Sequence, residues 1–223
     1  MPETTPGSQC SMTRLILVPA VITLAITILR LVGELRHWSK LFFNPAPGGP
    51  GALVGIVWLV PILGIYFAMR LAKAGKEAPR RWRPLVYALL GLVLMVAGGL
   101  VAFADQFQFT GKLVLGCLIM AAGALVPLYA WPVLGKALLA YAYAARLPVA
   151  IIMFFAIRGS WGTHYDAPPP GFPPMGFWMK YVQIALLPQL VLWVVFTVVV
   201  GVLFGGIANA LARRGELLPP AAP

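Results

Sequence analysis

The sequence predicts an all-α membrane protein, a polytopic transmembrane helical bundle of about six spans with both termini in the cytoplasm. Hydrophobic residues make up 61% of the 223 residues, charged residues only 10%, and the mean hydropathy is +0.88. Soluble domains carry roughly 25% charged residues. Long apolar stretches follow one another along the chain. A bilayer offers no water to unpaired backbone groups, so each stretch is expected to be helical.

Six stretches are long enough to span a membrane, because a spanning helix needs about 20 predominantly apolar residues. The predicted spans are 14–33, 51–69, 85–104, 113–131, 136–157 and 181–211. No polar block is long enough to build a separate soluble core. We therefore expect one membrane domain over 14–211, a disordered polar tail over 1–13 and a short cytoplasmic tail over 212–223.

Three of the predicted spans, the fourth, fifth and sixth, have unusual lengths or connections. The fourth and fifth are divided only by the short segment 130–136, which predicts a tight helical hairpin, with a re-entrant pair as the alternative. The sixth is longer than a bilayer requires. We expect it to tilt or to extend into the cytoplasmic interface.

The orientation follows from the Lys and Arg residues. Six of them lie between Arg70 and Arg83, in the connection between the second and third predicted spans. Short loops rich in positive charge stay in the cytoplasm. In this topology ten positive charges lie inside and five outside. The sequence therefore predicts a multi-pass protein of the cell inner (plasma) membrane.

The net charge of +11 does not indicate nucleic-acid binding, because the basic residues flank apolar stretches. Arg80, Arg81, Trp82 and Arg83 form a candidate docking site for anionic lipids or an acidic partner, with the Trp82 ring at headgroup depth. An orientation signal alone would explain the same charges.

Glycine pairs indicate how the helices pack, since lipid tails are as apolar as Leu and close packing at small residues holds membrane helices together. Such pairs occur in four predicted spans: Gly51 and Gly55, Gly91 and Gly98, Gly116 and Gly123, and Gly201 and Gly205. We expect them to form packing seams, within the chain or in a homo-oligomer. Prolines 61, 127, 148 and 188 are expected to kink their spans.

Two ionisable side chains lie inside apolar stretches. Arg30 precedes Glu34 by four residues, which predicts a local ion pair on one helix face. Arg146 lies ten residues beyond Lys136, about 15 Å along a helix and close to the bilayer centre. A charge there costs about 3 kcal/mol or more, so Arg146 should face the bundle interior and have polar partners.

The predicted spans place no acid beside Arg146. Its candidate partners are Tyr141 and Tyr143 in its own span, and Gln183 and Gln189 in the sixth. An Arg that is hydrogen-bonded but not neutralised is what an anion or lipid-headgroup site requires. The alternative is a polar clamp between helices, or a side chain that snorkels to the interface.

A second polar cluster follows from the topology, which places Glu34, His37, His164 and Asp166 on the outer side. Glu34 and His37 are three residues apart and share a helix face. Imidazoles with carboxylates suit a transition metal, a porphyrin iron or a proton relay. The alternative is an interfacial belt of polar and aromatic side chains, in which Asp166 caps the turn before the prolines at 168–170.

The sequence contains no Gly-rich phosphate loop, no Gly-x-Ser-x-Gly, no His-Glu-x-x-His and no Cys pair for a cluster. We therefore expect no catalytic activity and rank three functions. The first is an accessory or assembly subunit of a membrane complex, because the spans hold few polar groups. The second is a small permease or channel for an anionic or neutral solute that uses Arg146. The third is a redox or metal-binding subunit that uses His37 and His164.

Overall fold

The computed structural model describes residues 11–49, 51–104, 107 and 109–215, and every regular element in this part of the chain is helical. Five helices are long and apolar enough to cross a membrane. They are α1 (Met12–Leu35), α3 (Arg83–Phe103), α4 (Lys112–Ala130), α5 (Pro132–Gly159) and a continuous helix over Phe177–Ala212. The predicted tails fall largely outside the described residues. The chain is thus a helical bundle compatible with a multi-pass membrane protein.

The second predicted span, 51–69, is wrong in its bounds. α2 (Leu59–Lys73) has 15 residues, which corresponds to roughly 22 Å at 1.5 Å per residue, less than the ~30 Å of a hydrocarbon core. The segment before it is not helical, and Gly51 has a φ of 75°, which favours glycine. Pro61 lies in the first turn of α2, where its missing N–H disturbs nothing. Pro61 therefore helps to start this helix and does not kink it.

The fourth and fifth spans form the predicted helical hairpin, since Trp131 alone separates α4 from α5. The Trp131 side chain is 1% exposed. Its indole Nε1–H donates to the backbone oxygen of Lys76, 2.9 Å away. This bond ties the hairpin turn to the basic loop between α2 and α3.

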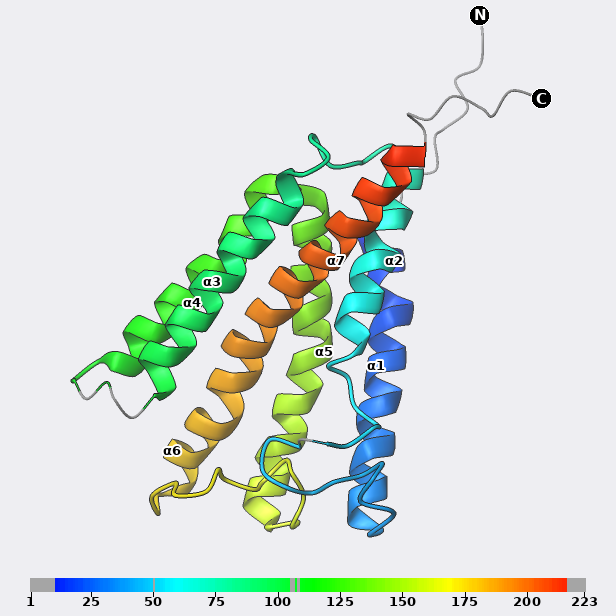
Figure 1. Cartoon of the computed structure of the whole chain (residues 1–223). Coiled ribbons are helices and arrows are strands. Elements are labelled where there is room, and N and C mark those ends of the chain that lie inside the picture. The colour runs from blue at the N-terminus through cyan, green and yellow to red at the C-terminus, as the bar shows by residue number, and fades with distance from the viewer. Residues whose placement is uncertain (1–10, 50, 105–106, 108, 216–223) are drawn as a thin grey trace, which may run out of the picture.

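The last helix begins earlier than predicted and changes its geometry on the way. It consists of α6 (Phe177–Tyr181), the π-helical turns η1 (Val182–Leu186) and η2 (Pro188–Leu192), and α7 (Trp193–Gly215). Pro188 lacks a backbone N–H, so the regular α-helical bonding cannot continue through it. α7 then crosses the bundle at an angle (Figure 1).

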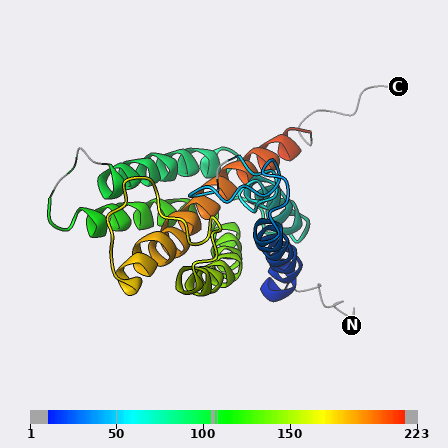
Figure 2. The same ribbon diagram turned by 90° about the horizontal axis from the view of Figure 1, so that it is seen from below.

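α3 and α4 form one pair, α1 and α2 form a second, looser pair, and α5 and α7 lie between them. α3 packs along α4, and both contact α7; α1 packs on α5, and α2 packs on α7 and α5. α5 and α7 therefore hold the two pairs together. The pairs diverge towards the end that carries segments 36–58 and 160–176, which we call the loop end (Figures 1 and 2). We call the opposite end, with the loop between α2 and α3, the basic end.

Glycines line two of the helix contacts. A Cβ added at Gly98 would lie 2.6 Å from the backbone oxygen of Gly116, and Gly91 faces Gly123 in the same way across the α3–α4 contact. Gly64 packs against the backbone of Gly201 between α2 and α7. These seams lie inside the chain. The predicted seam at 51 and 55 is absent, because neither residue is in α2.

Candidate functional site

Arg146 lies in the middle of α5 and is 4% exposed. It faces the bundle interior, as the cost of a charge in the bilayer predicts. One guanidinium nitrogen, Nη1, donates to Oε1 of Gln189 at 3.3 Å. The guanidinium carbon lies 4.8 Å from the centre of the Trp193 ring, a cation–π contact. Arg146 makes no other polar contact in the described part of the chain.

The π-helical turns place both partners of Arg146. Gln189 is the second residue of η2, and Trp193 is the first residue of α7. Gln189 also directs its Nε2 at the sulfur of Met153 on α5, 3.5 Å away. A π-helical turn widens the helix locally and is frequent at functional sites. Here it brings a polar and an aromatic side chain to the same buried cation.

Of the other predicted partners of Arg146, Gln183 lies at the cavity and Tyr143 does not. Gln183 lines the cavity that Arg146 lines. Tyr143 is 41% exposed and takes no part in it. Arg146 and Tyr143 are three residues apart, but Tyr141 is the tyrosine that α5 turns inward, where its hydroxyl lies 2.7 Å from the Thr23 hydroxyl of α1.

A cavity of about 1010 Å³ extends from Arg146 towards the loop end. Its walls come from α1, the segment before α2, the ends of α3 and α4, α5, the 160–176 segment and the π-helical turns. Apolar side chains dominate the walls. The charged lining residues are Arg30, Lys112 and Arg146, with His164 beside them, and none of the described lining residues is an acid. The charge of Arg30 is paired with Glu34, so Lys112 and Arg146 make the cavity electropositive.

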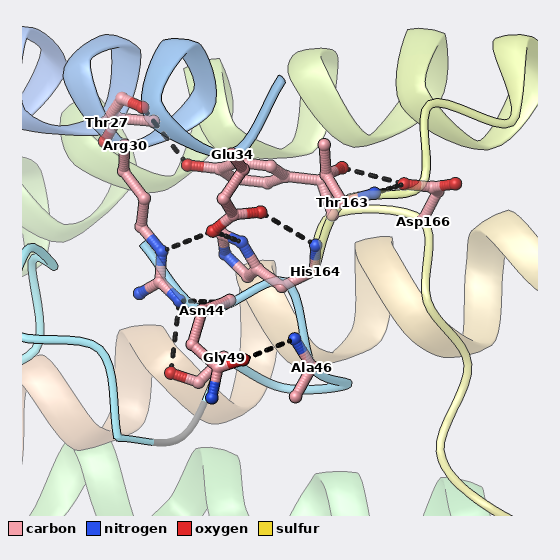
Figure 3. Close-up of polar contacts among 10 residues, drawn as sticks. Thr27, Arg30, Glu34, Asn44, Ala46, Gly49, Thr163, His164 and Asp166 are labelled. Atoms are coloured by element: carbon pink, nitrogen blue, oxygen red, sulfur yellow. Dashed lines mark hydrogen bonds and ion pairs between the residues drawn. The ribbon is translucent and has the colours of Figure 1, made fainter. Parts of the chain in front are cut away.

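Glu34 is the centre of a polar cluster at the loop end (Figure 3). Its side chain is fully buried, and Oε1 accepts from Arg30 Nε at 2.9 Å, which is the predicted ion pair. The same oxygen lies 2.6 Å from His164 Nδ1. Oε2 accepts from the His164 backbone N–H at 2.9 Å. α1 is thereby joined to the 160–176 segment.

Arg30 extends the cluster to the 36–58 segment, because its Nη2 donates to the backbone oxygens of Asn44 and Gly49 at 3.3 and 3.1 Å. The remaining predicted members lie apart. Asp166 accepts from the backbone N–H groups of Gly162 and Thr163, and so holds its own turn as predicted. His37 is exposed, with a φ of 52°.

Burial shifts the pKa values of two groups in the 160–176 segment, His164 and Tyr165. Burial lowers the pKa of the His164 imidazole, although its hydrogen bond to Glu34 opposes this shift. A neutral His164 that donates from Nδ1 to the Glu34 carboxylate fits this direction. Burial raises the pKa of the Tyr165 hydroxyl, which stays protonated and donates to the backbone oxygen of Thr27 at 3.2 Å.

Within the described residues, no three His, Cys, Asp or Glu side chains converge as a metal site would need. Glu34 and His164 meet, but Arg30 occupies the same carboxylate. The basic end is different in character. Arg81 donates to the Ala210 backbone oxygen at 3.0 Å and stacks on Trp82, which is 58% exposed. Arg80 is exposed, and Arg83 lies over the Tyr87 ring.

Several residues of the site were not predicted from the sequence. They are Trp193, Met153 and Lys112 at the cavity, and Asn44 and Gly49 at the cluster. Trp193 carries a signal that could have found it, because it lies one helical turn beyond Gln189. No protein family, curated protein or solved structure matches this chain. The chemistry of the cavity is therefore the basis for a functional proposal.

Proposed function

We propose that the protein is a small membrane permease that binds an anionic solute through Arg146. The observation behind this proposal is a guanidinium that is 4% exposed, lines a cavity and makes one hydrogen bond to the described residues. A buried charge without a partner of opposite charge costs several kcal/mol. A bound anion would offset most of that cost, and the free guanidinium nitrogens can hold a carboxylate or phosphate in two hydrogen bonds.

The cavity has the dimensions of a ligand site. Its volume of about 1010 Å³ lies at the upper end of the range for small-molecule pockets, roughly 300–1,000 Å³. Apolar walls with a few converging polar groups are typical of such pockets. Lys112 near the loop end would add to the attraction for an anion that approaches Arg146.

Passage across the membrane requires a rearrangement, because the bundle is tightly packed between the cavity and the basic end. Phe67, Leu134 and Leu138 are fully buried there. The π-helical turns around Pro188 are the natural place for such a change, since π-bulges and prolines interrupt regular helix bonding. Movement of η2 together with the first turn of α7 would carry Gln189 and Trp193 away from Arg146.

We further propose that the basic end faces the cytoplasm of the inner (plasma) membrane, with anionic lipids around Arg80 and Arg83. The density of positive charge in the 70–83 loop supports this orientation. The exposed Trp82 ring beside these charges suits headgroup depth.

An accessory or assembly role is the second proposal. The sequence predicted it because the spans hold few polar groups, and the glycine pairs were candidates for contacts in a homo-oligomer. Most of the glycine pairs pack within this chain, and the 160–176 segment is bound to α1 of the same chain through His164. The exposed apolar surface of the long helices still suits a membrane partner, but it suits lipid equally. We therefore place the anion permease first.

The experiment is uptake of ³²P-labelled inorganic phosphate and ³²P-labelled octyl phosphate into proteoliposomes. Three proteins are compared: the natural sequence, Arg146→Gln and Arg158→Gln. Arg158 is the matched control, because it is an exposed Arg at the end of the same helix. Loss of charge-assisted hydrogen bonds costs about 1.5–3 kcal/mol, so Arg146→Gln should slow uptake of at least one anion by tenfold or more.

Arg158→Gln should transport at the rate of the natural sequence. Equal rates in Arg146→Gln and the natural sequence would overturn the proposal, and so would the absence of uptake of both anions. Retained folding of Arg146→Gln is checked by its thermal unfolding in the same lipid.

A further inference from the structure

We infer that the anion is amphipathic, with a phosphate-like or carboxylate headgroup and an apolar chain, and that it enters the cavity from the bilayer. This inference rests on the proposed function, since it takes Arg146 as the anion-binding residue. Three features carry it: the cover over the loop end of the cavity, the apolar rim on its lipid-facing side, and the depth of Arg146.

The loop end of the cavity is covered by the chain itself. The 160–176 segment runs across the ends of the helices (Figure 2), and its residues 167 and 169–173 line the cavity. Asp166 fixes the start of this cover through backbone hydrogen bonds of 2.8 and 3.0 Å. Glu34 fixes it to α1 through His164. A solute from the water would have to displace this cover.

The lipid-facing side of the cavity has an apolar rim. Val57, in the segment before α2, and Phe103, at the end of α3, both line the cavity and are 40% and 47% exposed. They belong to the two helix pairs that diverge towards the loop end, and neither α1 nor α2 packs closely against α3 or α4. Both side chains are apolar, so we take them as the rim of an opening, while the exposed lining residues of the 160–176 segment belong to the cover. In the proposed membrane orientation this rim would face lipid.

The segment before α2 forms one side of this opening. Because α2 starts only at Leu59, the non-helical segment before it, with Gly55, Ile56 and Val57, forms the wall on that side. Irregular backbone at membrane depth is tolerated where it lines a cavity. The late start of α2 is thus linked to the same opening.

Arg146 lies deep in the bundle, far from the loop end. It lies 13 residues before the end of α5 at Gly159, so roughly 20 Å of helix separates it from the loop end. The walls between Arg146 and the rim carry Val149, Met153 and Ile184. An inorganic anion would leave these apolar walls without a partner. A chain attached to the headgroup would contact them and continue through the rim into the lipid.

The test measures binding of inorganic phosphate, butyl phosphate and octyl phosphate to the full-length protein in phosphatidylcholine nanodiscs by calorimetry. Heats from nanodiscs with Arg146→Gln are subtracted, which removes partition into the lipid. Each methylene that enters an apolar site tightens binding roughly fourfold. Octyl phosphate should therefore bind at least ~100-fold more tightly than butyl phosphate in the Arg146-dependent signal.

The rim is tested with Val57→Gln and Phe103→Gln, each of which makes the opening polar without adding charge. Val93→Gln is the control, because Val93 on α3 is 65% exposed and does not line the cavity. Both rim variants should weaken octyl phosphate binding by about tenfold and leave inorganic phosphate unchanged, whereas the control should change neither.

The outcomes separate the two proposals. Arg146-dependent binding that is equal for inorganic, butyl and octyl phosphate would overturn the amphipathic ligand and keep the anion permease. Equal affinity for octyl phosphate in the rim variants and the control would show that the bound chain does not pass through the rim, and would overturn that part of the inference. No Arg146-dependent signal for any of the three probes would overturn both the inference and the function on which it rests.

Discussion

Glu34 and His164 are 130 residues apart in the chain, and both carboxylate oxygens of Glu34 are bound to this one histidine. Oε2 accepts from the backbone N–H at 2.9 Å, and Oε1 lies 2.6 Å from the ring Nδ1. Arg30 shares Oε1 at 2.9 Å. One buried carboxylate therefore joins α1 to both segments at the loop end, the 160–176 segment directly and the 36–58 segment through Arg30.

Glu34→Gln should lower the free energy of unfolding by about 1–3 kcal/mol, the usual cost when a buried hydrogen-bonded charge loses its partner. The amide can still accept from one neighbour, but its NH₂ group would face the donors of Arg30 and His164. Thermal unfolding in nanodiscs measures the change. An unchanged unfolding temperature would show that the cluster does not hold the loop end together.

The protein should lose stability as the pH falls below about 6.5, the ordinary value for histidine. Burial lowers the pKa of His164 in the folded protein, so the unfolded chain binds the proton first and stability rises with pH across this window. Unfolding temperatures measured from pH 7.5 to 5 should show this slope. His164→Gln should flatten the slope, whereas His37→Gln, at an exposed position, should retain it.

Two adjacent glycines of α3 give opposite predictions. A Cβ at Gly98 would lie 2.6 Å from the Gly116 oxygen, whereas nothing lies within 4 Å of a Cβ at Gly99. Gly98→Ala should destabilise the protein by about 1–3 kcal/mol through overpacking. Gly99→Ala should be neutral or stabilise by up to about 1 kcal/mol through helix propensity. Comparable losses from both would indicate that α3 and α4 do not pack through this seam.

Orientation is tested by thiol labelling in a variant that lacks Cys10 and Cys117. Arg80→Cys at the basic end should react with a membrane-impermeant maleimide only after cells are opened, because the loop around it carries the dense positive charge. Lys40→Cys, exposed at the loop end, should react in spheroplasts. Labelling of Arg80→Cys in intact spheroplasts would reverse the topology.

Hydropathy predicted the long helices well, because length and apolar composition decide whether a segment can cross lipid. It failed at residues 51–58. That segment is as apolar as a span, but Gly51 occupies a left-handed conformation and Gly55 lies against the Arg30 guanidinium. Apolarity along a chain does not distinguish a helix in lipid from an irregular wall beside a cavity.

The sequence predicted those parts of the site that depend on residues close together in the chain or on the cost of a charge inside a span. The cost of a charge at mid-helix placed Arg146 inside, and the few polar residues of the last helix supplied Gln189. Four-residue spacing gave the Arg30–Glu34 pair. The link from Glu34 to His164 depends on how two distant segments fold together, and no spacing rule reports that. Closeness in sequence can also mislead. Tyr143 lies about one helical turn before Arg146, but its side chain is exposed and does not line the cavity.

The stability of Arg146 variants without ligand distinguishes an anion-binding residue from a structural clamp. If Arg146 is kept for an anion, the empty protein holds a buried charge with one 3.3 Å hydrogen bond and a cation–π contact. Arg146→Gln should then leave the free energy of unfolding unchanged or raise it by up to about 2 kcal/mol, because replacement of a buried charge is often neutral or stabilising. If Arg146 instead serves as a polar clamp between α5 and η2, Arg146→Gln should lower the free energy of unfolding by about 2 kcal/mol or more.

Unfolding in nanodiscs, with and without octyl phosphate, measures both effects. The ligand should raise the unfolding temperature of the natural sequence and leave that of Arg146→Gln in place, because only the folded natural protein binds it. Arg158→Gln should respond like the natural sequence, with a stability change within about 0.5 kcal/mol. A large loss of stability in Arg146→Gln, together with no response of the natural sequence to the ligand, would identify Arg146 as a structural clamp.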